Sequence, residues 1–485
     1  MTLPASLFWS LVRAMALLIL FGPLVPMLAA WVRGRPVRWA LLAAPFAFPE
    51  LLVGYAYAPW VAGRGWIAEL ACALLLGFRT LPVAVVAWAL SPPSDVTRSA
   101  LHCRRLALRT WFDRWDYVRL WMAGPLRRAL PSAGLFLLVT FQEFELAALL
   151  QATSWTDWLF VAQVQGMTLA ESLSAAMSPA AIEFVGIAVV LGLVGTPPSH
   201  GLLIDEERPA EPGVSTIAIV FLATAWVLGI AAPMAQLIAG LPAGLWQMAG
   251  QPLRWWGLFR ELMAGLSASV CAAVIAWGLS GWYFALMNSF TARPPATRRG
   301  LRRGTASALV LLCTPGLLGS LILALCVLAV FQHDALAPWY DTPLPWLVGL
   351  TLFLAPRAVL LQVWTSASPQ SSLHLAELLQ RSLDRAQRHA GAQLLWELHG
   401  EPRFLAVAML TYWGYLELTL ADLLAPTGVT SGVVRLYNFM HFGRTSALSA
   451  EAAVLLLVPL LGMWCLWMLL RWRPMRTPSS GASAR

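Results

Sequence analysis

The chain has 485 residues, of which 59% are hydrophobic and only 12% charged, and its mean hydropathy is +0.68. These values exclude an ordinary soluble globular protein and predict an all-α polytopic membrane protein. All 33 positively charged residues are arginines, and they lie mainly in the connections between apolar runs. The net charge of +9 therefore favours the positive-inside rule over binding to nucleic acid.

About eleven apolar runs are long enough to cross a bilayer of about 30 Å. They cover residues 7–31, 39–62, 66–92, 125–150, 178–197, 214–240, 261–285, 307–331, 345–365, 403–425 and 448–470. Arg-rich stretches follow at 33–38, 98–128, 292–303 and 381–403 and in the C-terminal tail. Threading the chain through eleven spans puts all of these stretches on one side, which the positive-inside rule identifies as the cytoplasm.

The polar, acidic and Pro-containing stretch at 198–213 is expected to be a linker. It separates a first half, 1–197, with five spans from a second half, 214–471, with six, and a basic cytoplasmic tail follows at 472–485. Each half contains a long cytoplasmic segment followed by a span that carries a carboxylate. Aligning the two spans pairs Glu143 with Glu417, so we expect two fused homologous halves around a central pathway.

The two long cytoplasmic segments have helical spacing in which arginines are mixed with apolar residues. In the second segment, Leu383, Ala386 and Ala390 line one face of the expected helix. A helix of this kind cannot enter the bilayer. It either lies at the lipid interface or docks on a soluble partner.

The stretch RAQRHAGA at 385–392 resembles the EAA-x3-G coupling loop of ABC importer permeases. Ala386 and Gly391 match that motif, Arg385 replaces its acidic residue, and Pro402 follows near the family distance. In the first half, GPLRRALPSAG resembles the exit from this loop, which a proline, here Pro125, opens. Phe112 falls about where the family glycine is expected.

Further stretches are similar to the iron(III)-type branch of these permeases. LLAAPFAFPELLVGYAY (41–57) and LCTPGLLGSLILAL (312–325) resemble its proline-marked second spans, and residues 425–457 resemble the segment after the second carboxylate-bearing span. In that family this segment is an extracytoplasmic re-entry loop above the substrate path. The resemblance therefore implies that the polar stretch VVRLYNFMHFGRTSALSAEA, which begins at residue 433, belongs to this re-entry loop.

The resemblance implies a permease subunit of the bacterial inner membrane with no catalytic site of its own. A separate cytoplasmic ATPase dimer would bind ATP and Mg²⁺ and receive the two coupling helices. A periplasmic binding protein would deliver the solute, which in this family is ferric iron, thiamine, a polyamine or a small oxyanion. Closure of the ATPases would rock the halves between inward and outward access.

Four carboxylates lie within or at the edge of the expected spans: Glu143, Glu145, Glu417 and Asp422. Because an ionised carboxylate is costly in lipid, these residues should face protein or a water-filled path. They either line the translocation path or act structurally, as helix caps or as partners of Arg79 and Arg357. Asn438 and His441 are further candidates for the translocation path. His441 could bind a metal or sense pH, or it is a hydrogen-bonded loop residue beside Asn438. Glu50, Glu69 and Glu183 are assigned no role.

A P-loop needs a lysine, and the chain contains none, so it cannot supply its own ATPase. No HExxH, paired zinc-ligand spacing or GxSxG motif occurs, and no cofactor or metal site is expected in this chain. Two other classes of function stay open. One is a secondary transporter driven by an ion gradient. The other is a membrane enzyme for lipid-linked substrates, with Asp113 and Asp116 on its active face.

Overall fold

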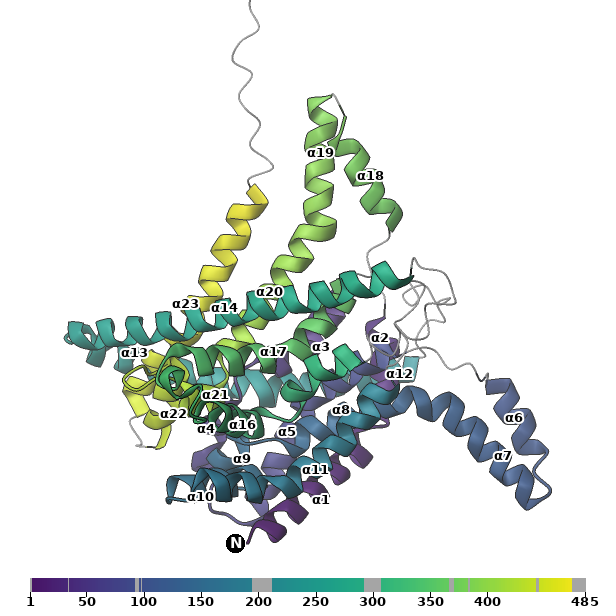
Figure 1. Cartoon of the computed structure of the whole chain (residues 1–485), viewed down its shortest axis with the longest axis horizontal. Coiled ribbons are helices and arrows are strands. Elements are labelled where there is room, and N and C mark those ends of the chain that lie inside the picture. The colour runs from purple at the N-terminus through teal and green to yellow at the C-terminus, as the bar shows by residue number, and fades with distance from the viewer. Residues whose placement is uncertain are drawn as a thin grey trace, which may run out of the picture. The chain divides into compact units, whose positions relative to one another are not determined.

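The computed structural model describes residues 2–33, 35–91, 96, 98–193, 212–291, 307–365, 370–382, 384–441 and 445–472 (Figure 1). Throughout these residues every regular element is a helix, and no β-strand is formed. The expected all-α architecture is therefore confirmed. Nearly all of the expected linker, 198–213, and all but the first residue of the expected tail, 472–485, lie outside the described residues.

The helices of the N-terminal part are α1 (Leu3–Phe21), α2 (Leu24–Val32), α3 (Pro36–Ala47), α4 (Glu50–Val61), α5 (Trp66–Leu90), α6 (Arg98–Leu106), α7 (Trp111–Trp121), η1 (Met122–Leu126), α8 (Arg127–Phe141), α9 (Glu145–Leu150), α10 (Trp155–Val164), α11 (Leu169–Leu193), α12 (Pro212–Trp226) and η2 (Val227–Ala231). The C-terminal part contains α13 (Ala232–Ala249), α14 (Pro252–Thr291), the helix Ser307–Leu317, α16 (Ser320–Phe331), η3 (Ala337–Trp339), α17 (Pro343–Thr365), α18 (Gln370–Gln380), α19 (Arg385–Leu395), η4 (Trp396–Gly400), α20 (Glu401–Tyr415), α21 (Leu418–Leu424), α22 (Gly432–His441) and α23 (Thr445–Trp472).

Seven stretches of helix in the described residues are long and apolar enough to cross a membrane, and there are ten if each bent helix pair is one span. These values support a multi-pass membrane protein but fall short of the eleven spans expected. The expected span 125–150 is not among these stretches; in this region α8 has 15 residues and α9 six, with a break between them. The chain turns at this break, around Glu143, so the apolar run 125–150 is divided between the end of the helix that begins at Trp111 and the short α9.

The bent pairs have identifiable local causes. Between α3 and α4 the chain bends by 60°, at Phe48 and Pro49. Proline disfavours helical backbone in the residue before it, and Phe48 is extended, with φ −73° and ψ 139°. Between Ser307–Leu317 and α16 the bend is 105°, and Gly319 has φ +76°, a left-handed conformation that favours glycine.

Contacts divide the chain into two compact units. The first unit comprises Met1–Gln236 with Leu317–Leu325, and the second comprises Leu237–Gly316 with Cys326–Arg485. In the first unit α8 packs against α1, α5 and α11, and α4 packs against α9. In the second unit α14, α17 and α20 pack against one another. The core of the first unit includes the buried side chains of Leu76, Phe136 and Leu146.

One sequence of elements occurs once in each unit: a helical hairpin, a π-helical turn and a helix that stops at a carboxylate. The helices α7 and α19 have 11 residues, the π-helical turns η1 and η4 have 5, and α8 and α20 have 15. The second set begins at 385, 396 and 401 and the first at 111, 122 and 127, a constant separation of 274 residues. Glu143 and Glu417 have this same separation.

Candidate functional site

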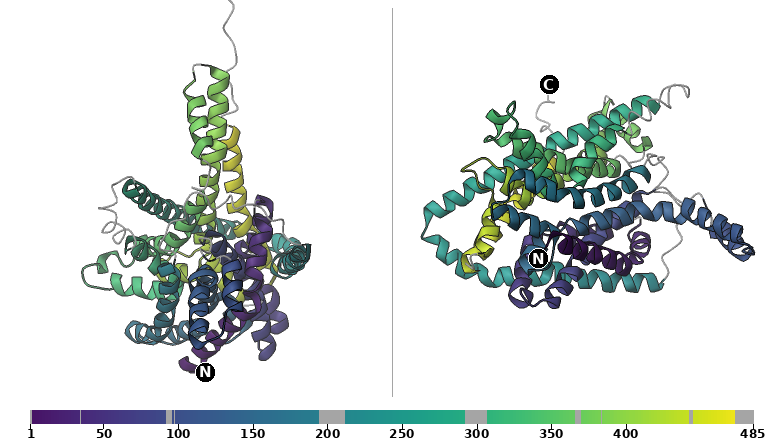
Figure 2. Two further views of the ribbon diagram at one scale, coloured as in Figure 1. Left: turned by 90° about the vertical axis from the view of Figure 1, so that its right-hand side faces the viewer. Right: turned by 60° about the horizontal axis from the view of Figure 1, so that its bottom comes forward.

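The second hairpin consists of α18 and α19, which lie side by side (Figure 2). Asp384 caps α19, because its Oδ1 accepts a hydrogen bond from the backbone N–H of Ala386 at 3.0 Å. Arg385 and Ala386 are exposed in the first turn of α19, and Leu383 lies outside the described residues. This end of the hairpin thus presents a capped helix start with a basic side chain.

Gly391 is a point of close approach between α19 and α18. A Cβ atom at this position would lie 2.5 Å from the backbone nitrogen of Gln380 and 2.8 Å from the carbonyl carbon of Leu379. Backbone atoms cannot move away cheaply, so only glycine fits. The glycine that matches the motif is therefore required for the close packing of α19 on α18.

The exit from each hairpin is a π-helical turn next to a proline. Pro125 lies inside η1, and Pro402 is the second residue of α20, directly after η4. Proline has no N–H to donate to the preceding turn, so one helical hydrogen bond is lost next to each π-helical turn. Both sequence-predicted prolines thus lie at the exit of a hairpin, although the 274-residue separation pairs Pro125 with His399 and Pro402 with Arg128.

The first hairpin consists of α6 and α7 and differs from the second in its chemistry. Thr110 caps α7 with a capping box in which its hydroxyl accepts from the Asp113 N–H at 3.2 Å and the Asp113 carboxylate accepts from the Thr110 N–H at 2.9 Å. Hydrogen bonds from the Thr110 side chain and backbone lower the pKa of Asp113. The Arg104 guanidinium lies 2.7 Å from the Asp116 carboxylate and joins the two helices.

The constant separation of 274 residues also relates single positions of the two hairpins. It pairs Phe112 with Ala386 and places Tyr117, not Phe112, opposite Gly391. Trp111, Phe112 and Trp115 are exposed on α7. The first hairpin thus has Tyr117 at the position of Gly391. Its exposed aromatic side chains correspond to Arg385, Ala386 and His389 of the second hairpin.

Glu143 lies at the break between α8 and α9 and is buried. Its Oε1 accepts a hydrogen bond from the Leu146 N–H at 2.7 Å, so it caps the start of α9. Its backbone carbonyl accepts hydrogen bonds from the hydroxyls of Ser154 and Thr156, at 3.0 and 2.7 Å. Glu145 begins α9 and is half-buried. Glu143 thus acts as a helix cap, which is one of the structural roles expected for it.

A second carboxylate, Glu50, lies beside Glu143. Glu50 begins α4 and forms an ion pair with Arg79 of α5. Arg79 also donates to the backbone carbonyl of Phe48, at the bend between α3 and α4. Sequence reasoning named Arg79 as a partner for the membrane carboxylates, and the structure pairs it with Glu50, to which no role had been assigned.

Glu417 occupies the N-cap position of α21 at the corresponding break in the second unit, and it is half-buried. Asp422 is exposed on α21. The convergence of Glu143 and Glu417 on one pathway stays a prediction.

The stretch resembling a re-entry loop forms α22. Asn438 is exposed on this helix and Tyr437 is buried. His441 ends α22, but its side chain and residues 442–444 lie outside the described part of the chain. The roles expected for Asn438 and His441 therefore stay predictions.

An ionic network fixes the start of α22 to its neighbours. The Nη1 atom of Arg435 lies 2.9 Å from both carboxylate oxygens of Glu261 in α14. Glu451 of α23 accepts from Arg254 Nε at 2.7 Å and from Arg435 Nη2 at 3.3 Å. The Glu451 side chain is completely buried, so its charge is compensated inside the protein by two guanidinium groups.

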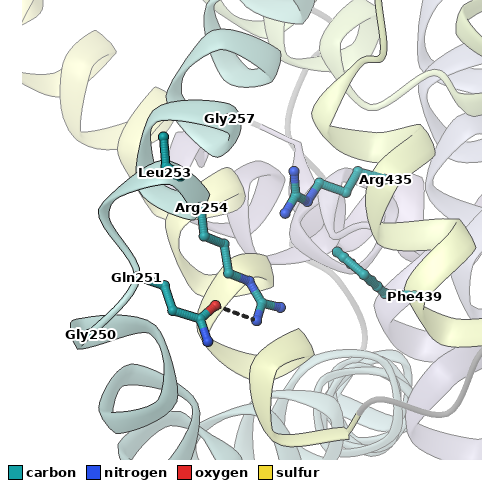
Figure 3. Close-up of a pocket in the computed structure, with 7 residues that line it drawn as sticks. All are labelled: Gly250, Gln251, Leu253, Arg254, Gly257, Arg435 and Phe439. Atoms are coloured by element: carbon teal, nitrogen blue, oxygen red, sulfur yellow. Dashed lines mark hydrogen bonds between the residues drawn. The ribbon is translucent and has the colours of Figure 1, made fainter.

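An open cavity of about 700 Å³ lies against this network. Its lining comprises Gly250, Gln251, Leu253, Arg254, Gly257, Arg435 and Phe439 (Figure 3). The guanidinium groups of Arg254 and Arg435 point from two helices toward one space, and both lie near the Phe439 ring, at 5.8 and 5.1 Å from its centre.

Sequence reasoning missed this cavity, although a signal was present. Arg254, Glu261 and Glu451 are charges at the ends of apolar runs, where charge is costly unless it is paired. Opposite charges in different runs could have been considered as partners. Among the described residues, no group of three His, Cys, Asp or Glu side chains is placed to hold a metal ion.

No protein-family model, curated protein or solved structure matches this chain.

Proposed function

We propose that the chain is the permease subunit of an ABC importer, similar to the iron(III)-type branch, with two fused homologous halves in the bacterial inner membrane. A separate ATPase dimer in the cytoplasm hydrolyses ATP, and a periplasmic binding protein delivers a small solute. The observation that supports this proposal best is the 274-residue recurrence of a hairpin, a π-helical turn and a helix ending at a carboxylate, with starts at 111, 122 and 127 and at 385, 396 and 401.

This recurrence has a mechanical consequence in each unit. The helix runs without interruption from α7 through η1 to the end of α8, and from α19 through η4 to the end of α20. Each is about 45 Å long at 1.5 Å per residue. A force on a hairpin is therefore carried along a stiff rod to the break at Glu143 or Glu417. An ATPase that grips both hairpins moves both breaks together, as alternating access requires.

The bent helix pairs support transport in general. Discontinuous helices near a binding site are typical of transporters, because the freed backbone groups face a cavity and not lipid. The solute class, ferric iron, thiamine, a polyamine or an oxyanion, is left open by the described side chains.

A secondary transporter driven by an ion gradient is the second candidate function. It is favoured by the buried Glu143 beside Glu50 at a helix break, since membrane carboxylates commonly act in ion coupling. In that case no ATPase is needed.

The test is purification of the tagged chain from the membranes of its native host, followed by native mass spectrometry and an ATPase assay. The importer proposal predicts two copies of a nucleotide-binding subunit for each chain, and ATP hydrolysis that vanishes when the P-loop lysine of that subunit is replaced. The matched control is a chain lacking residues 98–121 and 372–395. The proposal is contradicted if the wild-type chain, like this control, retains no nucleotide-binding subunit and shows no ATP hydrolysis.

A further inference from the structure

We propose that the cavity lined by Arg254, Arg435 and Phe439 is a binding site for an oxyanion, a phosphate or carboxylate group. It lies wholly within the second unit and involves no residue of either hairpin. The proposal therefore does not depend on whether an ATPase drives the protein.

The hydrogen bonds of Arg254 leave donors available on the cavity side. Its Nε donates to Glu451 at 2.7 Å, and its Nη1 makes only a long contact, 3.5 Å, to Gln251. Its Nη2 donates to no group in the described part of the chain. A guanidinium group has five N–H donors, and the planar pair left over is suited to two oxygens of one phosphate or carboxylate.

The carboxylates of the network lie behind the arginines. Glu451 is completely buried and the Glu261 side chain is 13% exposed, whereas Arg254 and Arg435 line the cavity. An entering anion thus meets guanidinium edges before it meets a carboxylate. Because Glu451 and Glu261 fix both arginines, the site is preorganised and loses little side-chain entropy on binding.

The cavity also lies at the N-terminus of α14, a 40-residue helix that begins at Pro252 and has no acidic residue in its first turn. The helix dipole and the N–H groups at this end favour negative charge. The same features disfavour a cation such as a polyamine.

Two of the residues that line the cavity, Gly250 and Gly257, have no side chain to occupy it. A Cβ atom at Gly250 would meet nothing within 4 Å, and one at Gly257 would lie 3.6 Å from Arg435 Nη1, an ordinary contact. A purely structural ion network would work as well with this volume filled. Gly257 therefore offers a way to reduce the volume of the site without replacing any residue of the ion pairs.

The oxyanion could be a free solute or the phosphate of a lipid headgroup, and the experiment separates these sources. The full chain is placed in phosphatidylcholine nanodiscs, and equilibrium binding of radiolabelled inorganic phosphate is measured, with citrate as carboxylate competitor. In a parallel arm, native mass spectrometry measures retention of phosphatidylglycerol. Saturable phosphate binding identifies a free oxyanion, and selective lipid retention identifies a headgroup.

The informative variants are Arg254→Gln, which removes the guanidinium donors, and Gly257→Leu, which reduces the cavity volume and replaces no residue of the ion pairs. Arg13→Gln is the control, because the buried Arg13 forms an ion pair with the half-buried Glu69, far from the cavity in sequence. We expect both site variants to weaken binding by about tenfold or more, and the control to leave it unchanged. The proposal is overturned if neither phosphate, citrate nor lipid binds saturably, or if Gly257→Leu binds as wild type does.

Discussion

Gly391 and Gln380 are in backbone contact across the α18–α19 hairpin, with room for a hydrogen atom and none for a Cβ, which would come within 2.5 Å of the Gln380 nitrogen. The hairpin is thus held by helix-to-helix packing within this chain. This packing explains the glycine at position 391 without any partner protein.

We expect Gly391→Leu to force α18 and α19 apart and to destabilise the hairpin by about 1–3 kcal/mol. Hydrogen exchange of the α18 and α19 amides should accelerate even when no ATPase is present. The control is Ala390→Leu, since Ala390 is exposed on the same helix. Unchanged exchange in Gly391→Leu would show that its close contact lies elsewhere, as in a groove of an ATPase.

The capping box of α7 should make the first hairpin sensitive to acid. Hydrogen bonds from Thr110 lower the pKa of Asp113 in the folded protein below its unfolded value. The stabilisation is therefore complete above the unfolded pKa of about 4 and is lost as the pH falls through the lower folded pKa. Hydrogen exchange of α7, corrected for intrinsic rates, should increase below pH about 4. Thr110→Val removes the hydroxyl and keeps the backbone N–H donor, so it should weaken this dependence, and α19, capped by Asp384, provides the internal comparison.

The positive-inside rule predicts that residues 98–124 and 372–401 both face the cytoplasm. Cys103 is already exposed on α6, and Arg388→Cys places a second thiol on α19. A membrane-impermeant maleimide should label neither residue in intact cells and both in inside-out vesicles. Labelling of either thiol from outside would refute the expected topology.

The sequence predicted the helical class and most span positions, because apolar runs of bilayer length need no knowledge of tertiary contacts. It also predicted the separation that pairs Glu143 with Glu417, since both follow recurring local patterns. The expected span 125–150 is the one that is not found among the described residues, because hydropathy does not record the break at Glu143.

Ion pairs between distant residues could not be predicted from local sequence patterns. Arg254 and Glu451 are 197 residues apart, and neither has a motif around it. Glu50 was assigned no role because its partner, Arg79, lies on another helix. The glycine at 391 was found by its motif, yet the motif says nothing about which surface the glycine approaches. Such partners become visible only when the helices are packed.

Arg79 should be more important for folding than any other group at the α3–α4 bend. Arg79→Met removes the cation that compensates Glu50 and the donor to the Phe48 carbonyl. Leaving a buried charge uncompensated costs about 3–5 kcal/mol. The double change Arg79→Met with Glu50→Gln should recover part of this loss in thermal unfolding. If the double variant is no more stable than the single one, the Arg79–Glu50 ion pair does not stabilise the bend.

The last prediction concerns Glu143 and Glu417, which share the 274-residue separation of the hairpins before them. If both line one path, their side chains converge, and a bifunctional maleimide should join Glu143→Cys to Glu417→Cys but not Glu143→Cys to Asp422→Cys. Gln at both positions should then impair transport-coupled ATP hydrolysis more than either single change does. Stability should be affected less, because the amide oxygen that Glu143→Gln introduces can still accept from the Leu146 N–H, as the carboxylate does. Two carboxylates on one path attract a cation together, so their effects on turnover should be non-additive. Additive losses of stability without cross-linking would leave both residues as separate helix caps.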